Sequence, residues 1–299
     1  MTSIRILDLT DRTVDAESPM FVHLLAESNG AVHGRIGVGV LADGHWALHL
    51  PDASIPVEEA TLLRLISSAV QFVKDNHRCA VGSKSTSVWL QCLLMPDDSR
   101  SSVLEASGLA DLTAISAFES TMDTLCSSLR DMWRPGRTRP EIRQLTPVEC
   151  ALDATETRLL PLIDHVLNTT DGVQCLPRLS PRECLKGWIH RTSTAVYVAE
   201  SRGGAGGPEG VLVVGVESPT GDEVGREIIF IGVRSDKRRC GVASALISDA
   251  LCDAGDIRSG GRVSVTCAEV NPTALAFYRR LGFIVVQRLR LFGSEIAME

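Results

Sequence analysis

One stretch in the second half of the sequence has the residue types of a phosphate-binding turn. Arg238, Gly241 and Ala243 come after a strand-like run that ends at Val233, and apolar residues at helical spacing follow them. A strand that enters a helix through such a turn presents free backbone N–H groups at the positive end of the helix dipole, which favours a phosphate. Glycine lets the backbone approach a ligand closely. Taken alone, the pattern also fits a basic surface turn.

A second stretch carries a tyrosine in a position suited to proton transfer. Asn271 and the proline after it predict the start of a helix. The helix has apolar residues three and four positions apart, so they share one face, and Tyr278 is among them. A tyrosine with its ordinary pKa of about 10 holds a proton at neutral pH and could give it to a leaving group. The alternative is an amphipathic helix with Tyr278 as a core aromatic residue.

The residues around the two stretches predict the elements that position them. Alternating and β-branched runs indicate strands, and capped runs with a helical period indicate helices. The predicted order in the second half is β-α-α-β-β-β-α-β-α-β. Strands are expected at residues 141–145, 194–200, 210–217, 227–233, 262–270 and 283–291, and helices are expected to begin at Thr146, Ser180, Arg239 and Asn271.

The first half gives a shorter version of the same order, without the two helices between its first two strands. Sliding the sequence by 174 residues sets Trp89–Asp97 on Val263–Asn271 and Gly108 on Gly282. We therefore predict an internal repeat, with chance similarity between β-α units as the alternative. A stretch rich in proline and arginine separates the halves. The predicted domains are residues 1–130 and 141–299, joined by a linker at 131–140.

Together and in this order, the two stretches resemble the acetyl-CoA loop and the following strand and helix of the GNAT superfamily of N-acetyltransferases. The resemblance covers residues 141–292. It implies an α/β (α+β) fold with two GNAT-like domains, each a mixed, mainly antiparallel twisted sheet flanked by helices. It also implies direct acetyl transfer from acetyl-CoA to an amine, without a metal. The positions that match the family's pattern are Arg238, Gly241, Ala243, Asn271, Ala274, Phe277, Tyr278, Gly282 and Phe283.

The resemblance also places the co-substrate. The pyrophosphate of coenzyme A should lie on the backbone amides that begin the helix after the turn. The pantetheine arm should lie where the strand ending at Val233 and the strand ending at Val270 diverge. Asn271 would contact this arm or cap its own helix, and Tyr278 would be the general acid for the departing thiolate. The residues expected to bind acetyl-CoA are Ile231, Gly232, Val233, Arg238, Arg239, Cys240, Gly241, Val242, Ala243, Ser244, Asn271, Phe277 and Tyr278.

Glu227 is the predicted general base. An amine must lose a proton before it attacks a thioester, and a carboxylate can accept that proton directly or through water. Glu227 begins a predicted strand eleven residues before Arg238, and the histone-acetylating branch of the family has a catalytic glutamate at the same offset. The alternative is a solvated charge at the start of a strand. Glu217 and Asp222 are weaker candidates.

The first half departs from the family's pattern. At the repeat offset, Leu104 stands where Tyr278 would be, and Asp97 stands at the place of Asn271. Residues 51–60, in the place of the phosphate turn, contain three acidic side chains and no glycine, and these charges would repel a pyrophosphate. We therefore predict a degenerate, non-catalytic GNAT-like domain in this half.

Charge, apolar runs and cysteine spacing argue against several other classes of protein. The net charge of −7 argues against a nucleic-acid-binding protein. The sequence contains no run of about 18 apolar residues, so no membrane span is predicted. The first residues lack the features of a signal peptide, so a cytoplasmic protein is expected. The nine cysteines include no C-x-x-C pair and no cluster with zinc-ligand spacing, which predicts free buried thiols in a reducing compartment.

Two other functions stay open. The chain could be a catalytically silent CoA-binding sensor or scaffold, although Tyr278 argues against a loss of turnover. It is also similar to mycothiol synthase in length and in having two GNAT-like halves, which suggests acetylation in small-thiol biosynthesis. The acceptor could be a small amine or aminoglycoside, a protein lysine or a protein amino terminus.

Overall fold

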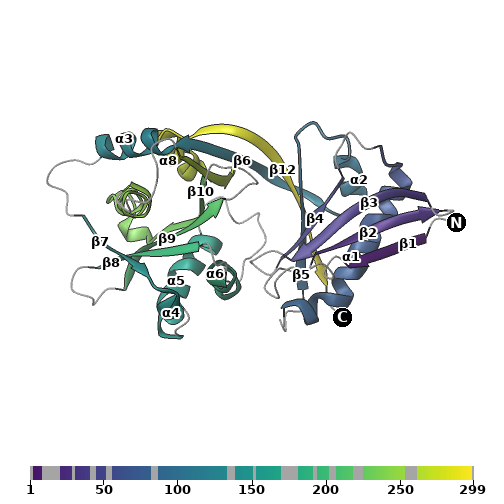
Figure 1. Cartoon of the computed structure of the whole chain (residues 1–299), viewed down its shortest axis with the longest axis horizontal. Coiled ribbons are helices and arrows are strands. Elements are labelled where there is room, and N and C mark those ends of the chain that lie inside the picture. The colour runs from purple at the N-terminus through teal and green to yellow at the C-terminus, as the bar shows by residue number, and fades with distance from the viewer. Residues whose placement is uncertain are drawn as a thin grey trace. The chain divides into compact units, whose positions relative to one another are not determined.

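The computed structural model of the chain divides into two compact units (Figure 1). The first unit comprises Met1–Ala114 and Leu289–Glu299, and the second comprises Ile115–Arg288. The predicted domains have other boundaries and stay a prediction about independently folding parts, since most of the predicted linker lies outside the described residues. The structure describes residues 3–8, 21–28, 31–40, 45–51, 56–81, 87–132, 139–150, 153–169, 181–190, 194–201, 207–217, 225–252 and 261–297.

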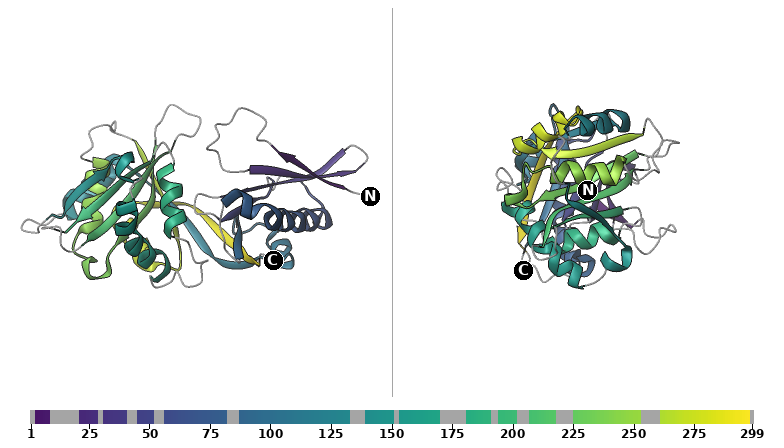
Figure 2. Two further views of the ribbon diagram at one scale, coloured as in Figure 1. Left: turned by 90° about the horizontal axis from the view of Figure 1, so that it is seen from below. Right: turned by 90° about the vertical axis from the view of Figure 1, so that its left-hand side faces the viewer.

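The first unit is a mixed sheet with helices packed on one face (Figure 2). Strands β4 and β5 are parallel, and the other neighbours are antiparallel. Helices α1 (Glu59–Val81) and α2 (Ser101–Ala106) share an apolar core with the sheet, in which the rings of Trp46 and Phe72 lie edge to face. The strand order is β1 (Ser3–Asp8), β2 (Phe21–Ser28), β3 (Ala31–Val40), β4 (Trp46–His49), β5 (Ser87–Leu94) and the later part of β12 (Ile284–Ala297).

The second unit is a mixed sheet covered by helices on both faces. The pair β10–β11 is parallel, and the pairs β6–β11, β9–β10, β8–β9 and β7–β8 are antiparallel. Helices α3 (Met122–Met132), α7 (Val242–Ile247) and α8 (Pro272–Arg280) form a core with one face, and α4 (Pro147–Cys150), α5 (Asp153–Thr169) and α6 (Pro181–His190) form a core with the other. The strand order is the first part of β12, β6 (Ala110–Thr121), β11 (Arg262–Ala268), β10 (Gly225–Val233), β9 (Pro208–Glu217), β8 (Thr194–Glu200) and β7 (Glu141–Leu145).

Two strands pass from one unit to the other along the chain. β6 belongs to the second unit from Ile115 onward, and this part pairs with β11. β12 belongs to the first unit from Leu289 onward, and this part pairs with β5. Each unit therefore obtains one strand of its sheet from the opposite half of the sequence.

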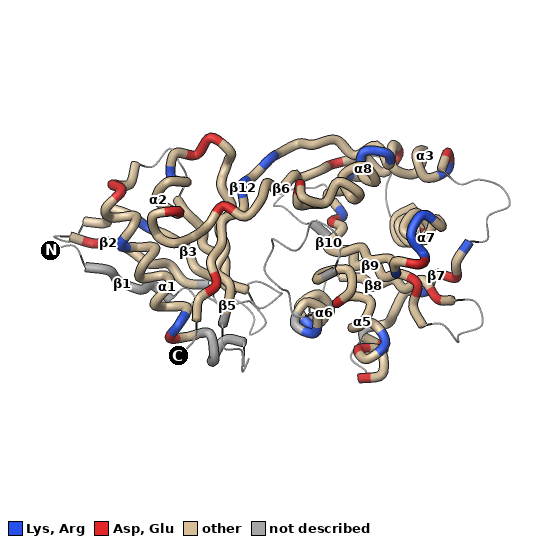
Figure 3. Tube along the Cα trace, turned by 180° about the vertical axis from the view of Figure 1, so that it is seen from behind, with Lys and Arg blue, Asp and Glu red and all other residues tan. Residues whose placement is uncertain are grey.

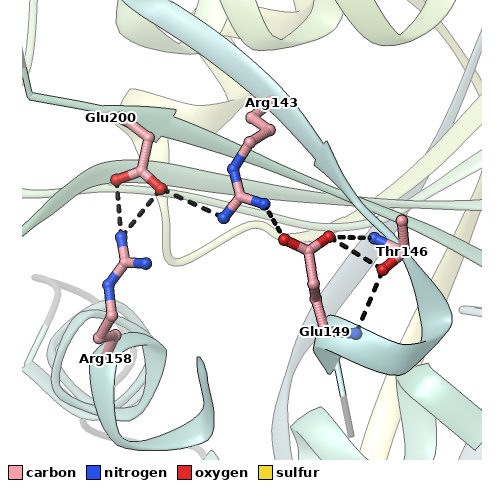
Figure 4. A network of polar contacts seen from close by, with 5 residues as sticks. All are labelled: Arg143, Thr146, Glu149, Arg158 and Glu200. Atoms are coloured by element: carbon pink, nitrogen blue, oxygen red, sulfur yellow. Dashed lines mark hydrogen bonds and ion pairs between the residues drawn. The ribbon is translucent and has the colours of Figure 1, made fainter. Parts of the chain in front are cut away.

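A polar network fastens the strand β7 to its neighbours (Figure 4). Arg143 of β7 forms ion pairs with Glu149 and, at 3.7 Å, with Glu200, and Arg158 of α5 donates to the Glu200 oxygens at 2.7 and 2.9 Å. The Glu149 N–H donates to Thr146 Oγ1 at 3.2 Å, and the Thr146 N–H donates to Glu149 Oε2 at 2.9 Å. The hydrogen bonds from Thr146 lower the pKa of Glu149. This reciprocal capping box confirms the helix start predicted at Thr146.

The predicted helices are present, with three differences. The helix expected to begin at Thr146 is the short α4, and a separate helix, α5, begins at Asp153. The helix expected after Arg239 begins at Val242, and after Ile247 it continues as a π-helical turn, Ser248–Cys252. Helix α3 has no counterpart among the predicted elements, although Leu125 and Leu129 bury its apolar face. Among the described residues, no helix is both long and apolar enough to cross a membrane.

A disulfide joins Cys126 of α3 to Cys252 at the end of the π-helical turn, with Cα atoms 5.9 Å apart. The prediction of free thiols is therefore wrong for this pair. Spacing could not reveal the bond, because the two cysteines are 126 positions apart and meet only in the folded unit. Five of the described cysteines lie outside a disulfide: Cys92, Cys150 and Cys184 are buried, Cys267 is half-buried, and Cys240 is exposed.

Candidate active site

Strands β10 and β11 are paired only at their beginnings. The parallel ladder joins Glu227 to Ser264 and Ile228 to Val265, and no later ladder pair between these two fully described strands follows. The pairing of β10 with β9 has a bulge directly after Ile228. From there to Val233, β10 keeps only β9 as a neighbour, while β11 continues beside β6. The backbone groups on this side of β10 therefore need a partner of another kind.

The turn after β10 leads into α7 through two left-handed residues. It begins with a hydrogen bond from the Arg234 N–H to the Glu209 carbonyl at 2.9 Å. Arg239 has a φ of 61° and Gly241 has a φ of 91°. Gly241 is the N-cap of α7, and its carbonyl accepts from the Ala245 N–H at 2.9 Å. Glycine suits this position because a left-handed backbone disfavours a Cβ.

The first turn of α7 offers backbone N–H groups to a ligand. No side chain caps the helix at Gly241, and the amides of Val242, Ala243 and Ser244 have no acceptor within the helix. Basic residues precede this helix start (Figure 3), so charge and helix dipole both favour an anion. α7 also packs tightly on β9, because a Cβ on Gly210 would lie 2.9 Å from Val242 Cγ1. The residues expected for phosphate binding thus lie together.

Tyr278 lies on the buried face of α8 and is 5% exposed. Its ring lies 5.9 Å from that of Phe118, 5.6 Å from that of Phe277 and 5.7 Å from that of Phe283, measured between centroids. Burial, and to a smaller extent the nearby thiol of Cys267, raises the pKa of Tyr278 well above its ordinary value. The phenol therefore keeps its proton through the neutral and moderately basic range.

Asn271 caps α8. Its Oδ1 accepts from the Ala274 N–H at 3.0 Å, and its own N–H donates to the Ala268 carbonyl at 3.0 Å. The capping role predicted for Asn271 is confirmed, and its Oδ1 is engaged in that role. Contacts of Asn271 and Phe277 with a cofactor arm stay predictions.

Glu227 lies on the face of the sheet opposite Tyr278. A Cβ on Gly215 would lie 2.9 Å from Ile229 Cδ1 and 3.9 Å from Glu227 Oε2, so both side chains cover the same part of β9. Ile229 packs against the core formed with α5 and α6, whereas Tyr278 belongs to the core formed with α3, α7 and α8. The two candidate catalytic residues therefore flank the sheet from its two sides, near the point where β10 and β11 part.

Strand β6 adds residues that the sequence did not single out. Phe118 is fully buried beside Tyr278. Ser116 lies opposite Cys267 in the ladder, and its hydroxyl donates to Glu269 Oε1 at 2.6 Å. The alternating pattern of these residues predicts a strand, but the pattern carries no information about which strand lies beside it.

In the first unit, an arginine links the turn before α2 to the chain just after β4. β4 and β5 form the parallel pair there. Arg100, in the turn before α2, donates from Nη1 to the carbonyl of Pro51 just after β4, and from Nε to Asp98 Oδ1 at 2.9 Å. The hydrogen bond from Arg100 lowers the pKa of Asp98. Helix α1 carries Glu59 in its first turn, where a pyrophosphate would be repelled. The degenerate, non-catalytic character of this domain stays a prediction.

Comparisons with known proteins point to one family. The family model described as an acetyltransferase (GNAT) domain matches residues 192–285. No curated protein matches the chain significantly. A tandem GNAT protein from the clavulanic acid biosynthesis pathway has a TM-score of 0.58 at 15% identity, over 94% of this chain and 84% of that one. GCN5-related N-acetyltransferases from Sphaerobacter thermophilus (TM-score 0.55, 18% identity, 93% and 81% covered) and Kribbella flavida (0.53, 12%, 92% and 86%) are also similar.

The matched residues run from the beginning of β8 to the beginning of β12. They therefore contain the parted strands β10 and β11, the turn with Gly241 and the helix with Tyr278. The structural likeness extends over most of the chain. At these low sequence identities it shows a similar fold and nothing about function. Residues 192–285 match the model of a GNAT acetyltransferase domain, and the chain has a fold like that of tandem GNAT proteins.

Proposed function

We propose that the chain is an acetyl-CoA-dependent N-acetyltransferase with one active site, located in the second unit. The observation that supports this most is that β10 and β11 part after Ile228, and that β10 then leads through a turn into the start of α7, where no side chain caps the helix. The unpaired side of β10 suits the amides of a pantetheine arm, and the helix start suits a pyrophosphate. Acetyl-CoA carries both groups, so it fits this arrangement.

The proposed binding residues follow the path of the chain. The amides from Arg239 to Ser244 would hold the pyrophosphate, with Arg238 adding positive charge. The backbone from Ile231 to Val233 would pair with the arm. Ile231 and Val233 pack against the core that contains Tyr278, so an arm on this side of β10 would lead toward that residue. When bound, acetyl-CoA supplies an acetyl group activated as a thioester.

Tyr278 would act as the general acid. It would give its phenolic proton to the sulfur that leaves when the C–S bond breaks, and burial keeps that proton in place beforehand by raising the pKa of Tyr278. On the other face, Glu227 would accept the proton that the amine loses as its nitrogen bonds to the acetyl carbon. Burial raises the pKa of the Cys267 thiol to about 11, which argues against a thiolate nucleophile beside Tyr278.

Calorimetric titration of the full chain with acetyl-CoA tests the site. Wild type is expected to bind one acetyl-CoA per chain, and Gly241→Asp is expected to lose binding because a Cβ and a negative charge would face the pyrophosphate. Gly108→Asp is the matched control. It places the same residue at a glycine with a φ of 84° and open space around its Cβ, in the first unit.

The outcomes separate the alternatives. Retained binding in Gly241→Asp would mean that the phosphate site lies elsewhere. Two acetyl-CoA molecules per chain would contradict the proposal of a single site and the degenerate first unit. Saturable binding without product, across a panel of small amines, lysine peptides and peptide amino termini, would favour a CoA-binding sensor. No binding at all would remove the proposed activity and leave the fold.

A further inference from the structure

One face of β6 is buried and faces α8. Ser116, Phe118 and Ser120 are 2%, 0% and 8% exposed, while the residues between them are only partly buried. Alternate residues of a strand share a face, so the three side chains form one row. Two of the three are serines, and a buried hydroxyl is unfavourable unless it finds a hydrogen-bond partner. The hydrogen-bond partners of these serines therefore show which segment this face of β6 binds.

The two serines bond to the two ends of the segment that carries Tyr278. The Ser116 hydroxyl donates to Glu269 Oε1 at 2.6 Å, in the turn that precedes the helix cap. The nearer acceptor of the Ser120 hydroxyl is the carbonyl of Gly282, directly after the helix, at 3.2 Å, and the carbonyl of Thr121 lies at 3.4 Å. Between them, Phe118 lies with its ring 5.9 Å from that of Tyr278. The row thus contacts α8 before, beside and after the tyrosine.

The far end of α8 is held by a close approach as well. Gly282 has a φ of 84°, and a Cβ there would lie only 2.6 Å from Thr124 Cγ2 in α3. The chain from β6 into α3 therefore packs closely against the end of α8. At the near end, Arg288 of β12 forms an ion pair with Glu269 at 3.3 Å, which orients the carboxylate that Ser116 binds.

We propose that Ser116, Phe118 and Ser120 are positioning residues for Tyr278, so that β6, which lies before the matched GNAT domain in the sequence, is a working part of the acetyl-transfer site. This inference rests on the proposed role of Tyr278 as the acid. The serines fix both ends of α8 and so fix the place of the phenol relative to the parted strands. Phe118 excludes water from one side of the ring.

Spectroscopic titration tests the role of Phe118 without any substrate. The chain has only two tyrosines, so Tyr278 is the sole phenol in a Tyr197→Phe background. In that background, Phe118→Leu is expected to lower the pKa of Tyr278, because burial is the main cause of its raised value. Phe72→Leu is the matched control, since that ring lies 5.9 Å from the ring of Trp46 in the first unit. An unchanged titration of Tyr278 in Phe118→Leu would overturn the role of Phe118.

The rate at which the CoA thiol is released tests the positioning role of the two serines. The acceptor is the best amine of the panel, or water. Ser116→Ala and Ser120→Ala are each expected to lower kcat roughly tenfold while the KM for acetyl-CoA changes little, because a displaced general acid affects the chemical step. Ser116→Thr and Ser120→Thr keep a hydroxyl and should recover part of the rate. Thr157→Ala is the control, since this exposed hydroxyl of α5 donates only to a carbonyl of its own helix in the described contacts.

Tyr278→Phe distinguishes the two ways in which the inference can fail. If Tyr278→Phe keeps the wild-type kcat, the proposed acid role is wrong and the positioning role falls with it. If Tyr278→Phe is slow but both serine variants keep the wild-type kcat, the acid role stands and β6 is only structural. Thermal unfolding of each variant shows whether it folds. If Phe118→Leu does not fold, Ser116→Ala and Ser120→Ala still test the positioning role of β6.

Discussion

The carboxylate of Glu227 and the phenol of Tyr278 lie on opposite faces of the same sheet in the second unit. A proton accepted on one face and a proton donated on the other need not compete for the same group. The two proposed roles can therefore be removed one at a time, with different effects on the rate and on its pH dependence.

Tyr278→Phe should lower kcat roughly a hundredfold and leave the affinity for acetyl-CoA nearly unchanged, because it removes the acid and keeps the ring. Burial raises the pKa of Tyr278, so in wild type the protonated phenol persists as the pH rises, and loss of this proton should not limit the rate in the moderately basic range. Steady-state kinetics across pH are the measurement. A wild-type rate in the variant at every pH would exclude Tyr278 as the acid.

Glu227→Gln should slow the reaction most at neutral pH, where an amine with a pKa of about 10 is protonated and needs a base. At higher pH the free amine becomes abundant, so the gap between variant and wild type should narrow. Rate profiles of both proteins check this. Glu141→Gln is the control, because it neutralises an exposed glutamate of β7. Equal rate profiles for Glu227→Gln and Glu141→Gln would mean that Glu227 is a solvated charge and not the base.

Reduction should break the covalent bond between α3 and the π-helical turn that follows α7. Peptide mapping of the unreduced protein should recover Cys126 and Cys252 in one linked fragment. Cys126→Ser should lower the free energy of unfolding of the oxidised protein by roughly 2–5 kcal/mol, since the bond closes a long loop. Cys240→Ser, which changes an exposed free thiol, should cost far less. Equal melting of oxidised and reduced wild type would show that the bond adds nothing.

Gly282→Ala and Gly108→Ala should differ, although the two glycines correspond in the predicted repeat. Both have a φ of 84°, so alanine should cost about 1–2 kcal/mol at either position. Only at Gly282 would the new Cβ also meet Thr124 Cγ2, at 2.6 Å, which should add roughly 1–3 kcal/mol. Chemical denaturation measures both costs. Thr124→Ser removes the clashing methyl group and should restore much of the loss in Gly282→Ala but not in Gly108→Ala.

Local features of this fold could be predicted from the sequence because nearby residues determine them. Thr146 and Glu149 cap each other, and Asn271 caps α8, as their types and spacing indicate. The repeat places Gly108 and Gly282 in the same backbone conformation. The turn with Gly241 also lies between a strand and a helix, where its residues predicted it.

Long-range partners could not be predicted in the same way. Nothing in the pattern of β6 indicates that residues 115–121 pair with 262–268, because alternation identifies a face and not a neighbour. The surroundings of Tyr278 and the bond between Cys126 and Cys252 both depend on such pairing. The opposite placement of Glu227 and Tyr278 likewise required the faces of the sheet to be known.

The passage of β12 into the first unit has a consequence for synthesis. A ribosome makes residues 1–114 first, but the strand that pairs with β5 emerges only after the whole second unit has been translated. Until then, one side of β5 exposes unpaired backbone groups in the nascent chain. The first unit to be made is thus the last to be completed, and a chain stalled before Leu289 would carry an open sheet edge that other chains could join.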